Sequence, residues 1–100
     1  MNTAALTNSA VTGLLIDQGL RILGVHSYRE LDLLFFVLNN GKVLQRNISA
    51  SKLLRDASQA ELDNVRLLGN GTGIHWPARD EDLSLKGLLL EEFAPKAVPA

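Results

Sequence analysis

Apolar residues follow two spacings along this chain, one typical of strands and one typical of helices. The clearest strand signal is segment 31–38, in which positions 33–38 are six apolar residues in a row. A run that is apolar on both faces favours a central strand covered on each side over an edge strand with one wet face. The preceding segment 20–27 also has strand-like spacing. We therefore expect the heart of the core at 31–38.

A turn signal follows this run directly, at Asn39-Asn40-Gly41. The Asn-Gly pair tolerates the positive φ angles of a two-residue type I′ turn, which joins antiparallel strands. The sequence thus predicts a hairpin in which residues 42–48 return beside the apolar run.

The middle of the chain contains a helix signal. Ser58 and Glu61 have capping-box spacing, in which each side chain accepts a hydrogen bond from the other residue's backbone N–H. Ser49 or Ser51 is placed to cap a helical turn at Leu53-Leu54, so we predict two short helices or one broken helix.

A second hairpin follows. Segment 65–68 is strand-like, the glycines at 69–73 reverse the chain, and 74–76 pairs back until Pro77, which has no N–H to donate.

Leucines at helical spacing mark the last element. One face of a helix is formed by residues at i, i+3, i+4 and i+8, namely Leu85, Leu88, Leu89 and Phe93. This helix should begin near Ser84 and lie on the sheet. The acidic run 80–82 precedes it, and negative charge is favoured at a helix N-terminus by about 0.3–1 kcal/mol. We interpret the run as the entry to this helix rather than a metal site, because three adjacent carboxylates do not converge on one ion.

The beginning of the chain is ambiguous. Val11, Leu14 and Leu15 have helical spacing, whereas Gly13 and Gly19 weaken a helix and leave a short strand with a turn as the alternative. The spacing slightly favours the helix.

The order of these elements predicts the domain organisation and the fold class. We divide the chain into an N-terminal segment 1–19 (a short helix or strand, partly frayed), a single α+β domain at 20–93 and a flexible tail at 94–100. Hairpins come before most of the helices, which favours an antiparallel sheet over a parallel one. We expect a small antiparallel β-sheet of about four to five strands, packed against short helices that include a C-terminal helix.

Composition narrows the class of protein. A chain of 100 residues has room for one modest core and no second domain. The 10 basic residues nearly balance the 11 acidic ones, so no overall field draws the chain to nucleic acid or to a membrane. The absence of cysteine excludes disulfides and thiolate chemistry. Without a secretion signal or an apolar run near ~20 residues, we expect a cytoplasmic protein with no membrane contact.

Chemistry-bearing residues gather around the second hairpin. Its glycines precede strand residues rather than the helix N-terminus that a phosphate site requires, so they indicate a tight turn. His75 lies near Asp80, which suggests a base oriented by a carboxylate. Strand alternation, however, turns His75 away from Ile74 and Trp76, and no nucleophile or pocket is evident beside it. We interpret His75 as structural or partner-facing.

Two further patterns have both a purely structural and a functional interpretation. Trp76 is either a core residue that closes over the last helix or an interface anchor, since Trp is frequent in both settings. Basic residues at 46, 52, 55 and 66 are interleaved with acidic ones, which favours a mixed solvated surface over a nucleic-acid patch. No pattern points to a cofactor, a metal or a small-molecule ligand. The candidate partner-facing residues are His75, Trp76, Asp80 and Asp82.

The same region carries a resemblance to a known family. It reads Gly-x-Gly-x-Gly-Ile-His-Trp-Pro from position 69, Asp-Glu-Asp-Leu-Ser from position 80 and Gly-Leu-Leu from position 87. Together with the upstream order of strand, hairpin, strand and Ser58-led helix, this run resembles the bacterial family called domain of unknown function 2442, over about residues 20–90. The resemblance implies a small α+β protein, often encoded beside another short protein in a toxin–antitoxin-like arrangement, and it implies no catalytic residue. Some relatives carry an added helix-turn-helix domain, which we do not expect here because only a short tail follows Phe93.

The sequence therefore favours a non-enzymatic interaction module over an enzyme. An open antiparallel sheet leaves a strand edge available to a partner. We expect a protein partner or a homo-oligomer, and the resemblance implies that this partner belongs to a toxin–antitoxin-like operonic pair. The alternative is a nucleic-acid-binding transcriptional regulator.

Overall fold

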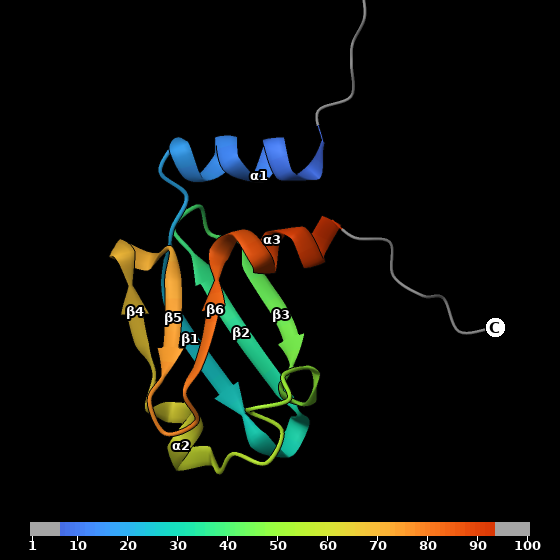
Figure 1. Cartoon of the computed structure of the whole chain (residues 1–100), viewed down its shortest axis with the longest axis vertical. Helices are drawn as coiled ribbons and strands as arrows, with labels where there is room; N and C mark the ends of the chain where they lie inside the picture. The colour runs from blue at the N-terminus through green and yellow to red at the C-terminus, as the bar shows by residue number, and fades with distance from the viewer. Residues whose placement is uncertain (1–6, 94–100) are drawn as a thin grey trace, which may run out of the picture.

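The computed structural model describes residues 7–93 and contains three α-helices and six strands (Figure 1). The elements follow in the order α1 (Asn8–Asp17), β1 (Ile22–Tyr28), β2 (Leu33–Leu38), β3 (Val43–Asn47), α2 (Gln59–Asp63), β4 (Arg66–Leu68), β5 (Gly73–Trp76), β6 (Glu81–Ser84) and α3 (Leu85–Phe93). Short 3-10 turns lie at η1 (Arg29–Leu31), η2 (Ile48–Ala50) and η3 (Gly69–Gly71). The α+β class is confirmed, while the tail at 94–100 lies outside the described residues.

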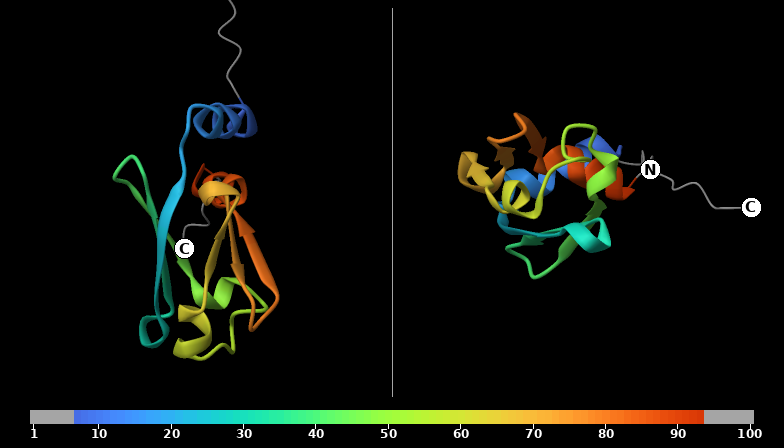
Figure 2. Two further views of the ribbon diagram at one scale, coloured as in Figure 1. Left: turned by 90° about the vertical axis from the view of Figure 1, so that its left-hand side faces the viewer. Right: turned by 90° about the horizontal axis from the view of Figure 1, so that it is seen from below.

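The strands form two antiparallel sheets of three strands each, with the orders β1-β2-β3 (the first sheet) and β4-β5-β6 (the second sheet). The expected single sheet of four to five strands is therefore wrong in both number and arrangement. Figure 2 shows the two sheets facing one another, with α3 across one end and α1 beyond α3. The core lies between the sheets and is made by Leu20, Ile22, Leu34, Phe36, Leu38, Leu44, Ile48, Leu54, Ala57, Leu62, Ile74, Trp76, Leu85, Leu88 and Leu89.

The apolar run is the central strand β2 of the first sheet, as predicted, but it is covered on one side only. Leu34 and Phe36 are fully buried against the second sheet. The alternate residues Leu33, Phe35 and Val37 are only partly buried, and no other element within residues 7–93 forms a layer over them. The expectation of cover on each side was wrong because the second sheet packs on one face of β2 alone.

The hairpin between β2 and β3 is confirmed, but its turn is not type I′. Leu38 N–H donates to Lys42 O at 2.9 Å, which leaves a three-residue loop. Within that loop only Gly41 has a positive φ, of +86°. A type I turn followed by glycine in the left-handed region is the usual three-residue hairpin loop. Asn39 is not needed for the turn geometry. Its side chain accepts a hydrogen bond from Arg21 N–H and donates one to Gly19 O, which fixes the start of β1.

The capping box at α2 is confirmed in both directions. Ser58 Oγ accepts from Glu61 N–H at 3.1 Å, and Glu61 Oε1 accepts from Ser58 N–H at 3.0 Å. The helix expected at Leu53-Leu54 does not form. Residues 51–56 make turns instead, because Leu54 is drawn into the core.

The acidic run does not lead into the last helix, and this interpretation was wrong. Asp80 lies in the turn after β5 with φ +50°, and β6 begins at the next residue. Pairing with β5 satisfies the backbone of β6, and the inward Glu81 accepts a hydrogen bond from the buried Ser51 hydroxyl. The helix α3 begins directly after β6, at Leu85, and Ser84 Oγ accepts a hydrogen bond from Gly87 N–H at 2.9 Å.

The ambiguous N-terminal segment is helical, as slightly favoured. Thr7 caps α1 by accepting from Ala10 N–H at 3.0 Å, and α1 packs on α3. Thr12 is the fully buried residue of this helix.

Candidate functional site

Trp76 is in the core and not on the surface, which corrects its place among the partner-facing candidates. Its side chain is 0% exposed, and its indole N–H donates to Leu62 O at 3.0 Å. The cause is strand alternation, which points both Ile74 and Trp76 of β5 inward. Trp76 ties the second sheet to α2.

His75 lies on the opposite face of β5, as alternation predicted, in a polar row across the second sheet. The register places Arg66, His75 and Asp82 side by side on β4, β5 and β6. His75 Nδ1 and Asp82 Oδ1 are 2.5 Å apart, with side-chain exposures of 26% and 68%. The carboxylate that orients His75 is therefore Asp82 and not Asp80, which is exposed in the turn. Of the four sequence candidates, the structure brings together His75 and Asp82.

This polar row has no further catalytic feature. A carboxylate-oriented imidazole has the geometry of a general base, but such a base needs a nucleophile or a substrate pocket beside it. His75 does not line any of five surface grooves formed by the described residues. Within residues 7–93 no three His, Asp or Glu side chains are placed to hold a metal ion. The row has the features of a structural cross-strand contact.

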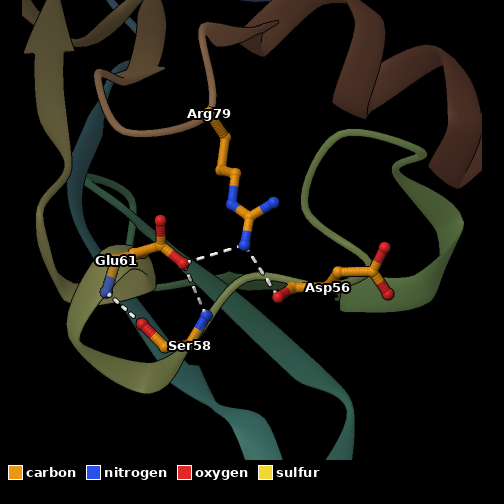
Figure 3. A network of polar contacts seen from close by, with 4 residues as sticks. All are labelled: Asp56, Ser58, Glu61 and Arg79. Atoms are coloured by element: carbon orange, nitrogen blue, oxygen red, sulfur yellow. Dashed lines mark hydrogen bonds and ion pairs between the residues drawn. The ribbon is translucent and has the colours of Figure 1, made fainter.

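A polar network joins the turn after β5 to the N-terminus of α2 (Figure 3). Arg79 Nη2 donates to Glu61 Oε1 at 2.9 Å and to Asp56 O at 2.8 Å. The hydrogen bond from Ser58 N–H, followed by the one from Arg79, holds the pKa of Glu61 below its ordinary value of 4.5. The sequence identified Glu61 through the capping box, but it carried no signal for Arg79, which approaches from a distant turn.

This lowered pKa predicts a pH dependence of stability. A carboxylate with a lowered folded-state pKa stabilises the fold above pH 4.5 and loses that contribution as the pH falls through the folded-state value. Glu61→Gln keeps the capping box and removes the charge. We expect the variant to be less stable than the wild type at neutral pH and the difference to shrink below about pH 4, measured by urea unfolding.

Glu30→Gln is the control, because Glu30 is exposed and forms no ion pair with another described residue. A difference between wild type and Glu61→Gln that does not change with pH would contradict the role of this network.

The outer side of the first sheet is an apolar surface. We call it the outer face, on which the polar His26, Gln45 and Asn47 lie among the apolar side chains of Leu23, Tyr28, Leu33, Phe35, Val37 and Val43. Leu23, Tyr28 and Val43 are 62%, 49% and 52% exposed. Tyr28 packs its ring edge-on to Phe35, with centroids 5.7 Å apart. No Lys, Arg, Asp or Glu occupies any outward-facing paired position of this sheet. Contiguous apolar surface of this kind marks binding sites in soluble proteins.

The strand β3 borders the outer face and leaves one edge of the first sheet open. Lys42 and Ile48, at either end of β3, form hydrogen bonds with the β2 side at 2.9 and 3.0 Å. Because backbone groups alternate along a strand, Val43, Gln45 and Asn47 direct their N–H groups to the open side. The C=O groups of Val43 and Gln45 point the same way. Outside η2, no other segment within residues 7–93 bonds these backbone groups.

The opposite edge of the same sheet is covered at both ends. Gln59 of α2 donates to Ser27 O at 3.0 Å and accepts from Arg29 N–H at 2.8 Å, so one side chain caps the free groups at the end of β1. At the other end, Gly71 lies against the backbone of Ile22. Along β3, in contrast, the outward backbone groups from Val43 to Gln45 and the N–H of Asn47 are bonded by no other described segment. The sequence predicted the hairpin that contains β3 but had no signal for which strand would stay unpaired.

No described helix combines the length and the apolar character needed to cross a membrane. Among curated proteins, none matches the chain.

Comparison with solved structures identifies relatives of the same fold. A protein of unknown function from Rhodospirillum rubrum is 32% identical, with a TM-score of 0.64, over 77% of this chain and 93% of its own. An uncharacterised protein from Chromobacterium violaceum shares the fold at 21% identity and a TM-score of 0.66, over 95% of this chain and 90% of its own. The family model described as protein of unknown function (DUF2442) matches residues 28–94. That match covers more than half of the chain and confirms the resemblance found in the sequence, so the protein belongs to the DUF2442 family.

Proposed function

We propose that this protein is a non-enzymatic protein-interaction module, which binds by pairing a strand of its partner with the open edge of β3. The observation that carries the proposal is the row of free backbone groups on Val43, Gln45 and Asn47. An extended segment added to such an edge gains main-chain hydrogen bonds, while the adjacent side chains give specificity.

The edge lacks several of the devices by which proteins prevent strand addition. Natural edges are blunted by proline, by bulges, by inward charges or by a covering segment. β3 contains no proline, and its register with β2 runs without a bulge from Val43 to Asn47. Its one inward charge, Arg46, is neutralised by Glu91 of α3 at 3.0 Å. The edge of β1, in contrast, is capped by Gln59.

The surface around this edge supports binding to protein rather than to nucleic acid. The outer face carries no Lys or Arg at its paired positions, and its one histidine is His26, opposite Phe35. Arg46 and Arg66, two members of the basic group considered in the sequence, lie on different sheets, and Arg46 is already paired. We extend the proposal to a place within a toxin–antitoxin-like operonic pair, which rests only on the gene arrangement that the family resemblance implies.

Gln45→Pro is the variant that tests the edge. Its N–H points away from β2, so proline blocks the edge while leaving the ladder with β2 intact. Gln45→Thr is the matched control, because threonine changes the side chain, keeps the N–H and suits a strand. We expect partner affinity to fall by roughly tenfold or more for Gln45→Pro and to change little for Gln45→Thr, as several main-chain hydrogen bonds contribute.

The measurement uses a photo-reactive amino acid in place of Asn47, expressed in the native cell. A covalent adduct of defined mass should form in the wild-type and Gln45→Thr backgrounds and disappear in the Gln45→Pro background. Circular dichroism of each purified variant verifies that the fold is retained. An adduct that persists at full yield in Gln45→Pro would show that binding does not use this edge.

A further inference from the structure

We infer that the strand which pairs with the open edge of β3 is β3 of a second copy of this chain, antiparallel and centred on Gln45. The inference rests on the proposed function and names the partner of the same edge. In this arrangement Gln45 lies opposite Gln45 of the second copy, and Val43 lies opposite Asn47. The two first sheets become one sheet of six strands.

Backbone geometry permits this pairing. The free groups of β3 lie on alternate residues, which are the positions that exchange hydrogen bonds in an antiparallel ladder. The two Gln45 residues exchange two bonds, and each Asn47 N–H donates to Val43 O of the other copy. At least four hydrogen bonds thus form between groups that no other strand within residues 7–93 satisfies.

The charges of Lys42 and Arg46 favour this register over the two adjacent registers. A register centred on Leu44 places Lys42 opposite Arg46 twice, and a register centred on Arg46 places the two arginines opposite one another. Like charges directly opposite are destabilising in a sheet. The register centred on Gln45 places Arg46 opposite Leu44 and Lys42 opposite Ile48. The two Lys42 residues are then roughly 20 Å apart, well beyond the Debye length of about 8 Å.

The groove beside β3 has the charge to receive a second copy. Two grooves of about 280 and 390 Å³ run along the strand, and both are lined by Gln45, Arg46, Asn47 and Glu92. The first groove also contains Leu44, the residue opposite which Arg46 of the second copy arrives. Glu92 is exposed and forms no ion pair with another residue of the described part. In the dimer each Arg46 keeps its ion pair with Glu91 of its own chain at 3.0 Å and arrives beside the exposed Glu92 of the other copy, once on each side of the two-fold axis.

The position of α3 is consistent with this groove. Figure 1 shows α3 crossing the upper end of the first sheet, and Glu91 of its last turn pairs with Arg46 of β3 at 3.0 Å. A five-residue strand pair buries less than the roughly 1,600 Å² of a standard interface. We therefore expect a weak dimer in rapid exchange, which a covalent trap detects better than a mass measurement alone.

A single introduced cysteine provides that trap, because the chain has none of its own. The Cα atoms of a hydrogen-bonded antiparallel pair are about 5.5 Å apart, within the ~4.4–6.8 Å that a disulfide spans. In full-length Gln45→Cys the two thiols meet on the two-fold axis. In Val43→Cys they are about 14 Å apart and cannot bond. Combining Val43→Cys with Asn47→Cys restores the contact.

Under mild oxidation we expect Gln45→Cys and the double variant to form disulfide dimers at least about tenfold faster than Val43→Cys. Equal rates for Gln45→Cys and Val43→Cys would overturn the register. A Gln45→Cys chain that stays monomeric, while the adduct at position 47 contains a different protein, would overturn the second copy and leave the proposed function standing. An adduct that also survives Gln45→Pro would remove both.

Discussion

Replacing Trp76 with alanine is expected to lower the free energy of unfolding by about 3–5 kcal/mol, a large part of the 5–15 kcal/mol typical of a small domain. Trp76 is fully buried between the second sheet and α2, so the substitution leaves a cavity. It also removes the indole N–H that satisfies Leu62 O at 3.0 Å. Urea unfolding followed by circular dichroism measures the loss.

His75→Ala is the matched control for this prediction. The two residues are adjacent on β5 but face opposite sides of the sheet. Truncation of the half-buried His75 removes its contact with the exposed Asp82 but opens no cavity in the core, so we expect a loss of about 1 kcal/mol. If His75→Ala costs as much as Trp76→Ala, the inward and outward faces of β5 are assigned the wrong way round.

Gly71→Ala is expected to be the second most damaging change, at about 2–5 kcal/mol. Gly71 has φ +96°, a backbone conformation that alanine adopts only with strain. A Cβ built on it would lie 2.4 Å from Ile22 O, so the backbone of β1 or η3 would have to move. This contact is where the glycine-rich turn of the second hairpin meets the first sheet. The single tryptophan, Trp76, reports unfolding by its fluorescence.

Gly41→Ala separates the two causes of this effect. Gly41 also has a positive φ, of +86°, but a Cβ there would meet nothing within 4 Å. We expect Gly41→Ala to cost about 1–2 kcal/mol, which is the backbone strain alone. A loss for Gly71→Ala no larger than that for Gly41→Ala would show that η3 does not approach β1 as closely as described.

The candidate site shows where sequence reasoning succeeds and where it stops. Alternation along β5 correctly turned His75 away from the core, because the period of two is a property of the strand itself. Alternation could not show that Asp82 would lie beside His75, because that contact depends on the pairing of β5 with β6. The acidic residues of β6 had been interpreted as the start of a helix. Gln45 attracted no attention in the sequence, because a polar residue on a strand carries no sign of whether its backbone is paired.

The sequence by itself determined the local elements: the apolar strand β2, its hairpin, the capping box of α2, the glycine turn and the terminal helix. Each of these depends on interactions among residues close together in the chain, so spacing and residue type are enough to predict them. Only the tertiary structure decided that the strands divide into two facing sheets, that Trp76 is buried and that the edge of β3 is left open. These features depend on contacts between segments far apart in sequence, such as Gln59 with β1 and Arg79 with Glu61, for which one chain contains no local signal.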